Sequence, residues 1–242
     1  MKKFISTIFA LALWLGVFAQ NDTLFIHRGG QIIYELPVAN IDSITFVRVQ
    51  RPSQPPIETD TGVVINGVRW ATRNVDMPNT FAENPESLGM FYQWDRNIGW
   101  SSTDPMINSN GGTTWDSFAP TGSTWERAND PCPQGWRVPT REEIETLGNT
   151  ANVSSQWTTV NGVNGRTFTD RNTGNSIFLP AVGWRNSPRG ALLVAGDDGV
   201  YWSSTFIGTA NAWGLGFVRG SVSAGTVILI RAGGSSVRCV AE

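Results

Sequence analysis

The chain contains two cysteines, Cys132 and Cys239, and they bracket its C-terminal half. Cys132 opens the run Cys-Pro-Gln-Gly-Trp-Arg-Val-Pro-Thr, which leads into a short predicted helix, and Cys239 lies in the predicted last strand. A disulfide between them would join the start of the helical segment to the chain end and restrict everything in between. Two free thiols are the alternative. The choice depends on the compartment, because disulfides persist where conditions are oxidising.

The N-terminus has the pattern of a secretory signal peptide. Two lysines precede an apolar run from Phe4 to Phe18, and Ala19 supplies a small residue at the cleavage site. The run is too short for a stable membrane span, although an uncleaved tether is the alternative. Cleavage would leave Gln20 first, with no cysteine for a lipid anchor. We therefore predict a signal peptide at residues 1–19 and a secreted or cell-surface chain without a transmembrane segment, in which two cysteines favour a disulfide.

The charge balance argues against a nucleic-acid partner. Both lysines lie in the predicted signal, so cleavage takes the net charge from −2 to −4 and leaves arginine as the only strongly basic residue. This sign is wrong for phosphate binding, and no basic stripe is present. Arginine favours bidentate carboxylate pairing and stacking on aromatic rings, and all but one of the 11 tryptophans remain after cleavage. The alternative explanation of this arginine-only composition is compositional drift.

Residues 20–47 predict a small leader module. Two β-prone runs, Thr23–Arg28 and Gln31–Leu36, flank Gly29-Gly30, which is a signal for a tight hairpin, and Ile41–Phe46 is a third apolar segment. So short a piece cannot bury a core of its own. We therefore expect the leader to dock on another surface, in cis or in trans, or to donate a strand.

The remainder of the chain predicts a linker at residues 48–61, which is polar and rich in proline, and one large domain at residues 62–242. In that domain Asn66-Gly67 between two apolar runs predicts a type I′ hairpin. Thr140 followed by Glu143 is a capping box for one helix. Short runs separated by glycine-rich turns follow. Residues 212–218 alternate small and large side chains, including Gly214 and Gly216, as a half-buried strand does, and residues 227–230 predict a further strand. The predicted class is α+β, a mainly antiparallel sheet with few helices and long structured loops.

Three motifs resemble those of the Fibrobacter succinogenes major paralogous domain: Cys-Pro-x-Gly-Trp-Arg-x-Pro-Thr from Cys132, Tyr-Trp-Ser-Ser-Thr from Tyr201, and Val-Arg-Cys-Val at the end. That family is similar in fold to the C-type-lectin-like and formylglycine-enzyme group. The resemblance covers residues 62–242 and implies a C-type-lectin-like domain in which Cys132 pairs with Cys239. It also implies structural roles for Trp136, Arg137, Thr140, Glu143, Trp202 and Arg238. The leader is similar to leader modules of secreted Bacteroidetes proteins.

Catalysis finds little support in the sequence. His27 is the only histidine and lies in the leader, so a Ser-His-Asp or Cys-His arrangement and a histidine-rich metal site are excluded from the large domain. Formylglycine enzymes use reactive cysteines, whereas both cysteines here match the structural bridge. A two-carboxylate hydrolase is the alternative, but no spacing singles out a pair. We expect no enzyme; the carboxylates considered are Asp95, Asp104, Asp116, Glu126, Asp197 and Asp198.

Tryptophans in polar, glycine-rich surroundings are the more promising binding feature. Flat exposed rings stack on sugars or form protein hot spots. We expect one or two of five to face a functional groove: Trp100, Trp115, Trp125, Trp184 and Trp213. The resemblance places Trp184, Trp213, Asp197 and Asp198 among the ligand-presenting loops. Asp197-Asp198-Gly199 offers carboxylates to calcium, but no calcium–sugar motif accompanies it and a solvated turn is the alternative. No other cofactor is expected.

The sequence therefore predicts an exported, non-catalytic recognition module, an adhesin-like domain at the cell surface or on a fimbria that binds a glycan or a protein. The first alternative is a structural subunit that assembles by strand addition through the leader module. The second is the carboxylate-based hydrolase.

Overall fold

The computed structural model describes residues 23–28, 31–40 and 60–242. The chain divides into two compact units, Met1–Ile57 and Glu58–Glu242. The predicted signal peptide, the third apolar segment of the leader and most of the predicted linker lie outside the described residues. Within the described part of the chain, no helix is both long enough and apolar enough to cross a membrane.

The described part of the first unit is a β-hairpin. Strand β1 (Thr23–Arg28) pairs antiparallel with β2 (Gln31–Pro37), and a short 3-10 helix, η1 (Val38–Asn40), follows. The hairpin predicted around Gly29-Gly30 is therefore present. Two strands cannot enclose a core, and four large apolar side chains are exposed: Phe25, Ile26, Ile32 and Tyr34.

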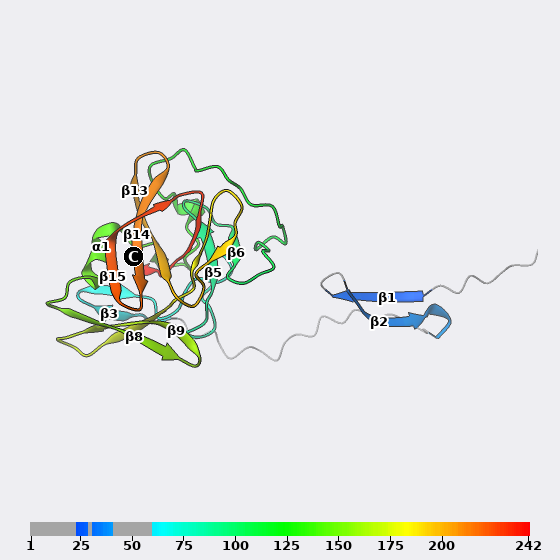
Figure 1. The fold of residues 1–242 in the computed structure, drawn as a ribbon, viewed down its shortest axis with the longest axis horizontal. Helices are drawn as coiled ribbons and strands as arrows, with labels where there is room; N and C mark the ends of the chain where they lie inside the picture. The colour runs from blue at the N-terminus through cyan, green and yellow to red at the C-terminus, as the bar shows by residue number, and fades with distance from the viewer. Residues whose placement is uncertain (1–22, 29–30, 41–59) are drawn as a thin grey trace, which may run out of the picture. The chain divides into compact units, whose positions relative to one another are not determined.

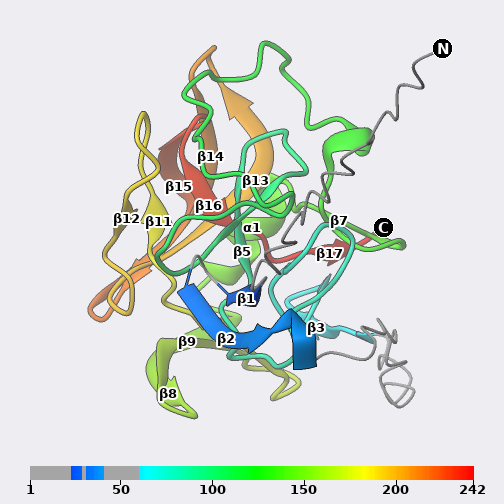
Figure 2. The same cartoon turned by 90° about the vertical axis from the view of Figure 1, so that its right-hand side faces the viewer.

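The second unit, which we call the main unit, contains a four-stranded sheet built from distant parts of the chain. Its order is β3-β4-β17-β7, so the last strand lies between strands from the start and the middle of the unit. Figure 2 shows β17 beside β7. Asn66 and Gly67, at φ of 47° and 84°, form the predicted turn between β3 and β4. The bounds are β3 (Val63–Ile65), β4 (Val68–Trp70), β7 (Trp136–Arg137) and β17 (Val240–Ala241).

Two further sheets complete the main unit. One is antiparallel in the order β10-β9-β8, and the largest runs β12-β11-β16-β13-β14-β15, with β5 paired to β16 and β6 to β5. Only the β13–β16 pair is parallel among these strands. The predicted class, a mainly antiparallel sheet with few helices, is confirmed. The bounds are β5 (Met90–Gln93), β6 (Gly99–Ser101), β8 (Val153–Val160), β9 (Val163–Asp170), β10 (Ser176–Pro180), β11 (Trp184–Arg185), β12 (Leu192–Leu193), β13 (Gly199–Ile207), β14 (Asn211–Val218), β15 (Ser221–Ile230) and β16 (Gly234–Ser236). A 3-10 turn, η2, spans Arg127–Asn129.

The α-helix of the main unit, α1 (Arg141–Leu147), begins at the predicted capping box. Thr140 Oγ1 accepts from the Glu143 N–H, and the Glu143 carboxylate accepts from the Thr140 N–H. Ile144 and Leu147 are buried in a cluster that includes side chains of β13 and β14. Figure 1 shows α1 beside β13, β14 and β15. The helix therefore covers one face of the largest sheet.

Removing the helix cap should have a measurable cost. We expect Thr140→Ala to lower the free energy of unfolding by about 1 kcal/mol, because the Glu143 N–H loses its acceptor at the helix start. Urea titration followed by tryptophan fluorescence measures the change. Thr209→Ala, at an exposed threonine outside the helix, is the matched control. Equal midpoints for the two variants would contradict the structural role of the cap.

The two cysteines form a disulfide, with the sulfur atoms 2.10 Å apart and a sequence separation of 107. The Asp130 carboxylate accepts from the N–H groups of Cys132 and Val138 and so connects the segment before β7 to the residue after it. The carbonyl of Cys239 accepts from Ala71 N–H at 2.9 Å. The bridge thus ties the segment before β7 to the segment before the last strand. It lies in a hydrophobic cluster that also contains Trp136 and Trp202.

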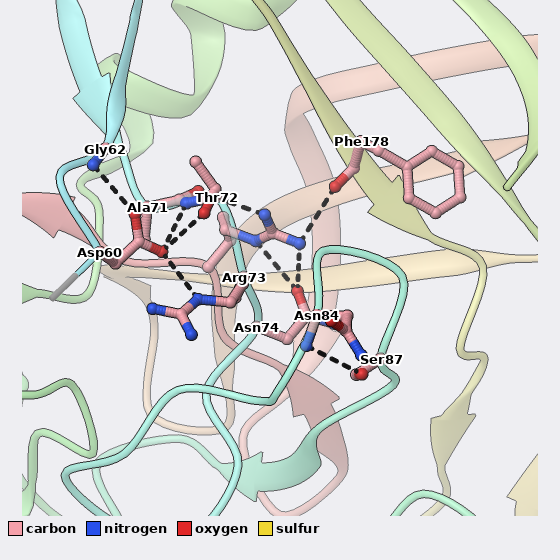
Figure 3. A network of polar contacts seen from close by, with 10 residues as sticks. Asp60, Gly62, Ala71, Thr72, Arg73, Asn74, Asn84, Ser87 and Phe178 are labelled. Carbon is pink, nitrogen blue, oxygen red and sulfur yellow. Dashed lines mark hydrogen bonds and ion pairs between the residues drawn. The ribbon is translucent and has the colours of Figure 1, made fainter. Parts of the chain in front are cut away.

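A buried arginine side chain connects separate segments of the main unit by hydrogen bonds. Arg238 is buried, and its guanidinium donates to Asn74 Oδ1 at 3.0 and 2.8 Å, to Ala71 O at 3.2 Å and to Phe178 O at 3.1 Å. Burial lowers the pKa of Arg238 to about 10, so the group remains charged at neutral pH. Figure 3 shows Asn74 and Phe178 converging in this network. Arg238 therefore fastens β10 to the segment after β4.

Asp60, which the sequence analysis placed in the linker, is the first described residue of the main unit. Its carboxylate accepts from Gly62 N–H, from Thr72 N–H and from Thr72 Oγ1, and it pairs with Arg73 at 3.5 Å (Figure 3). The side chain of Asp60 is almost fully buried in these contacts. Asp60 therefore belongs to the main unit, because its carboxylate anchors the entry of the chain.

The expected use of arginine is also visible near the surface. Arg137 makes two hydrogen bonds with Glu143, Nη1 to Oε2 at 2.8 Å and Nη2 to Oε1 at 2.6 Å, which is the bidentate geometry of a guanidinium–carboxylate pair. The guanidinium of Arg141 lies over the ring of Trp213, 4.0 Å from its centroid. The bidentate pair needs the planar fork of a guanidinium, which lysine does not offer, and a guanidinium also stacks well on an indole ring.

Candidate binding groove

A groove of about 410 Å³ crosses the face of the largest sheet that α1 does not cover. Tyr201, Leu215 and Phe217 belong to the cluster under the helix, and successive side chains of a strand point to opposite faces. Their neighbours in β13 and β14 therefore face away from α1. We call this hollow the sheet groove. The lining used below comprises Trp184, Asp198, Val200, Gly216, Val227 and Leu229.

Two glycines of β14 explain why this face is hollow. A Cβ atom on Gly216 would lie 2.8 Å from Val227 Cγ2, and one on Gly214 would lie 2.6 Å from Leu229 Cδ1. Side chains at these positions would displace the β15 residues that lean over the strand. The absence of side chains on alternate residues of β14 thus makes room for aliphatic groups of β15. The result is a groove with a mostly apolar lining.

Trp184 and Asp198 reach the groove from neighbouring segments. Trp184 is half-buried in β11, and the carbonyl of Asp198 accepts from Gly183 N–H at 2.7 Å, which ties the turn before β13 to the residue before β11. The turn is further closed by the N–H groups of Asp197 and Asp198, which both donate to Val194 O at 3.1 Å. Burial, with a smaller contribution from the Asp197 carboxylate, raises the pKa of Asp198. A single partly desolvated carboxylate therefore lies at a groove whose lining is mostly apolar.

The structure does not bring the other two predicted ligand-binding residues to the groove. Trp213 lies in β14 on the face that α1 covers, where the guanidinium of Arg141 stacks on it. Asp197 is exposed, but its side chain is not part of the groove lining. The resemblance suggested ligand-presenting loops, whereas Trp184 and Trp213 are both strand residues. Because side chains alternate between the two faces of a strand, Trp184 reaches the groove and Trp213 lies on the face that α1 covers.

The remaining tryptophans predicted as loop residues are buried. The Trp100 and Trp115 ring centroids lie 4.8 Å apart, and Trp115 Nε1 donates to Ala232 O at 3.1 Å. Trp125 packs against Trp94 with centroids 5.4 Å apart. These rings anchor the long connection between β6 and β7, which the structure describes throughout and which contains no strand and only the short 3-10 helix η2. Trp136 and Trp202, for which the resemblance implies structural roles, are buried as well, and so is Trp70.

The acidic residues considered for catalysis mostly make structural contacts. Asp104 pairs with the buried Arg185 at 3.1 Å, and Asp116 pairs with Arg96 at 2.8 Å. The Asp95 carboxylate accepts from Glu126 N–H and from Asn129 Nδ2. Across the described residues, no group of three or more His, Cys, Asp or Glu side chains is placed to hold a metal ion. The groove thus offers apolar surface, one indole ring, one carboxylate and the serines Ser221, Ser223 and Ser235 to a ligand.

Sequence reasoning missed most of the groove lining. Val227 and Leu229 were expected as a strand, and Gly214 and Gly216 as the small residues of an alternating one. The pairing of Gly214 with Val227 brings these two strands together. The alternation of glycine with large apolar residues was the available signal, because it marks a strand with one bare face.

Comparison of this chain with models of protein families, with curated proteins and with solved structures found no match.

Proposed function

We propose that this protein is an exported, non-catalytic recognition module that binds a glycan or a protein at the cell surface, in an adhesin-like role. The observation that carries the proposal is the sheet groove, a hollow of about 410 Å³ on one face of the largest sheet. The signal-peptide pattern and the motifs that resemble the Fibrobacter succinogenes major paralogous domain support the location and a C-type-lectin-like fold. The disulfide is compatible with both.

The chemistry of the groove favours binding over catalysis. Ligand sites are concave and mostly apolar, with a few polar groups that orient the ligand. Trp184 supplies a flat ring for stacking, and Asp198 supplies a hydrogen-bond acceptor. The lining contains no second carboxylate and no thiol. Three serines, Ser221, Ser223 and Ser235, also line the groove, but the lining has no histidine to activate their hydroxyls. A ligand can therefore be held and oriented here without an activated nucleophile or a pair of carboxylates among the lining residues.

A binding screen tests the proposal directly. The purified chain is applied to arrays of glycans, to extracellular matrix proteins and to cell-surface extracts, with calcium and with a chelator. We expect saturable binding to at least one ligand class, and the two buffers show whether calcium contributes. Absence of binding to all three sources would contradict the recognition role.

The contribution of Trp184 gives the sharper prediction. We expect Trp184→Ala to weaken ligand binding at least about tenfold, because an aromatic anchor in a binding site is typically worth more than 1 kcal/mol. Trp213→Ala is the matched control, since it removes the same ring from the opposite face of the sheet. Isothermal titration calorimetry with the ligand found in the screen measures both. Equal weakening by the two variants would place the binding site outside the groove.

A structural subunit is the second candidate, and the leader hairpin favours it. This two-stranded unit exposes Phe25, Ile26, Ile32 and Tyr34, and an isolated hairpin is at best marginally stable in water. Strand addition to a neighbouring subunit would cover these side chains. Limited proteolysis that removes the leader should then abolish assembly. Assembly that survives the removal would exclude the leader as the assembling element.

A further inference from the structure

Among the described residues, strand β15 forms an edge of the largest sheet, and helix α1 covers only its first half. Helix α1 lies against that half: Arg141 Nε donates to Gly225 O at 2.8 Å, and a Cβ atom on Gly148 would lie 2.9 Å from Ala224 Cβ. Beyond Gly225 the helix makes no comparable contact within the described residues. There the side chains of Ile228 and Ile230 are 55% and 53% exposed. The second half of β15 is therefore an open apolar edge.

The hydrogen-bond pattern shows which backbone groups point outward from this edge. Arg231 N–H donates to Ala210 O at 2.9 Å, one position beyond the last residue pair of β14 and β15. Hydrogen-bonded and non-hydrogen-bonded pairs alternate in an antiparallel ladder. Leu229 and Val227 therefore bond to β14, whereas Ile228 points both its N–H and its C=O away from the sheet. Ile230 also points its N–H outward, and its carbonyl accepts from Gly233 N–H at 2.8 Å.

The edge lacks the features that normally prevent strand pairing. Proteins protect edge strands with charged residues, proline or a covering element. The ten residues of β15, Ser221–Ile230, include no charged residue and no proline. The bulge at Gly225, whose φ is 69°, lies under the helix rather than on the open half. An uncharged strand of this kind does not repel a copy of itself.

We propose that the open half of β15 pairs antiparallel with the same segment of a second copy of this chain, around a two-fold axis at Ile228. The N–H of Ile228 in each copy then donates to the Ile228 C=O of the other, so the outward groups satisfy one another. A two-fold contact requires a surface that is complementary to itself, and this pattern of one donor and one acceptor on the same residue meets the requirement. Burial of Ile228 and Ile230 from both copies adds apolar contact.

The dimer has a consequence for the sheet groove, because Ile228 and Ile230 also belong to the groove lining. A two-fold axis through an antiparallel strand pair is perpendicular to the sheet, so equivalent faces of the two copies lie on the same side. Both grooves would therefore open in one direction, with β15 of each copy between them. Two sites on one face allow bivalent attachment to a surface, which strengthens binding without any new contact.

The mass in solution and amide exchange test the proposal on the full chain. Multi-angle light scattering should show a concentration-dependent species near twice the mass of one chain, which is 26.4 kDa before the predicted signal peptide is removed. Ile228→Lys should give the monomer at all concentrations, because it places like charges at the two-fold axis. Hydrogen exchange at the Ile230 amide should be at least about tenfold slower in the dimer than in this variant, since the amide is unpaired in the monomer.

The leader offers a matched control. Ile32 is 54% exposed on β2, which is close to the exposure of Ile228, so Ile32→Lys introduces the same charge into another exposed strand. We expect this variant to remain dimeric. A monomeric wild-type chain, a dimer that persists in Ile228→Lys, or a dimer lost only in Ile32→Lys would each overturn the proposal. Protection of the Ile230 amide that appears only when another protein is added would overturn it as well.

Discussion

A chain in which both Cys132 and Cys239 are replaced by serine is expected to lose about 4 kcal/mol of unfolding free energy. The two residues are 107 positions apart, so the bridge restricts a large part of the unfolded chain, and loop-closure entropy accounts for most of the effect. The bridge also lies in a hydrophobic cluster, where two serine hydroxyls would lose water. Urea titration of the two chains under oxidising conditions measures the difference.

Two controls separate the bridge from the packing around it. Reduction of the wild-type chain under denaturing conditions, followed by refolding with a reductant, removes the bond and retains the sulfur atoms. We expect this material to lose most of the same free energy. Intact-mass analysis after alkylation provides the second control, because a natively purified chain should accept no alkyl group. Two alkylated thiols in that material, or a double-serine variant as stable as the wild type, would contradict the role of the bridge.

The features that local sequence determines were the ones that could be predicted. The capping box at Thr140 and Glu143 requires only four consecutive residues, and the Asn66-Gly67 turn requires only a left-handed pair between two apolar runs. The disulfide was favoured because a chain with an export signal and two cysteines leaves one intramolecular pairing. Each of these inferences depends on the chemistry of neighbouring residues or on a count. None requires knowledge of how distant strands pair.

The groove could not be predicted in the same way, because it depends on strand register. Gly214 faces Val227 only because a bulge at Gly225 shifts the later part of β15, and Trp184 joins the same face from a strand earlier in the chain. Trp213 illustrates the limit. Trp213 and Trp184 are the same residue type and have similar sequence neighbours. The alternation of side chains along β14 nevertheless turns Trp213 to the face that α1 covers, where the guanidinium of Arg141 stacks on it. Residue type indicated that tryptophans could bind a ligand, but the pairing of the strands determines which tryptophan reaches the groove.

Arg238→Met is expected to lower the free energy of unfolding by about 3–5 kcal/mol, the other large effect that the structure predicts. Methionine fills much of the same space but donates no hydrogen bond. The Asn74 side-chain oxygen and the carbonyls of Ala71 and Phe178 would each lose a buried donor. Tyr201 is buried beside the same network, and its hydroxyl retains Pro180 O as acceptor at 2.7 Å. Urea unfolding at neutral pH, where Arg238 is charged in the wild type, measures the loss.

Two further variants distinguish this network from a general effect of arginine removal. Arg189→Met, at an exposed arginine, should change the free energy of unfolding by less than about 0.5 kcal/mol. Arg238→Lys keeps the charge but has no planar fork, so one ammonium cannot reach the acceptors on both Asn74 and Phe178. We therefore expect the lysine variant to lose more than half of what the methionine variant loses. A lysine variant as stable as the wild type would show that charge alone, and not the forked geometry, holds β10 to the segment after β4.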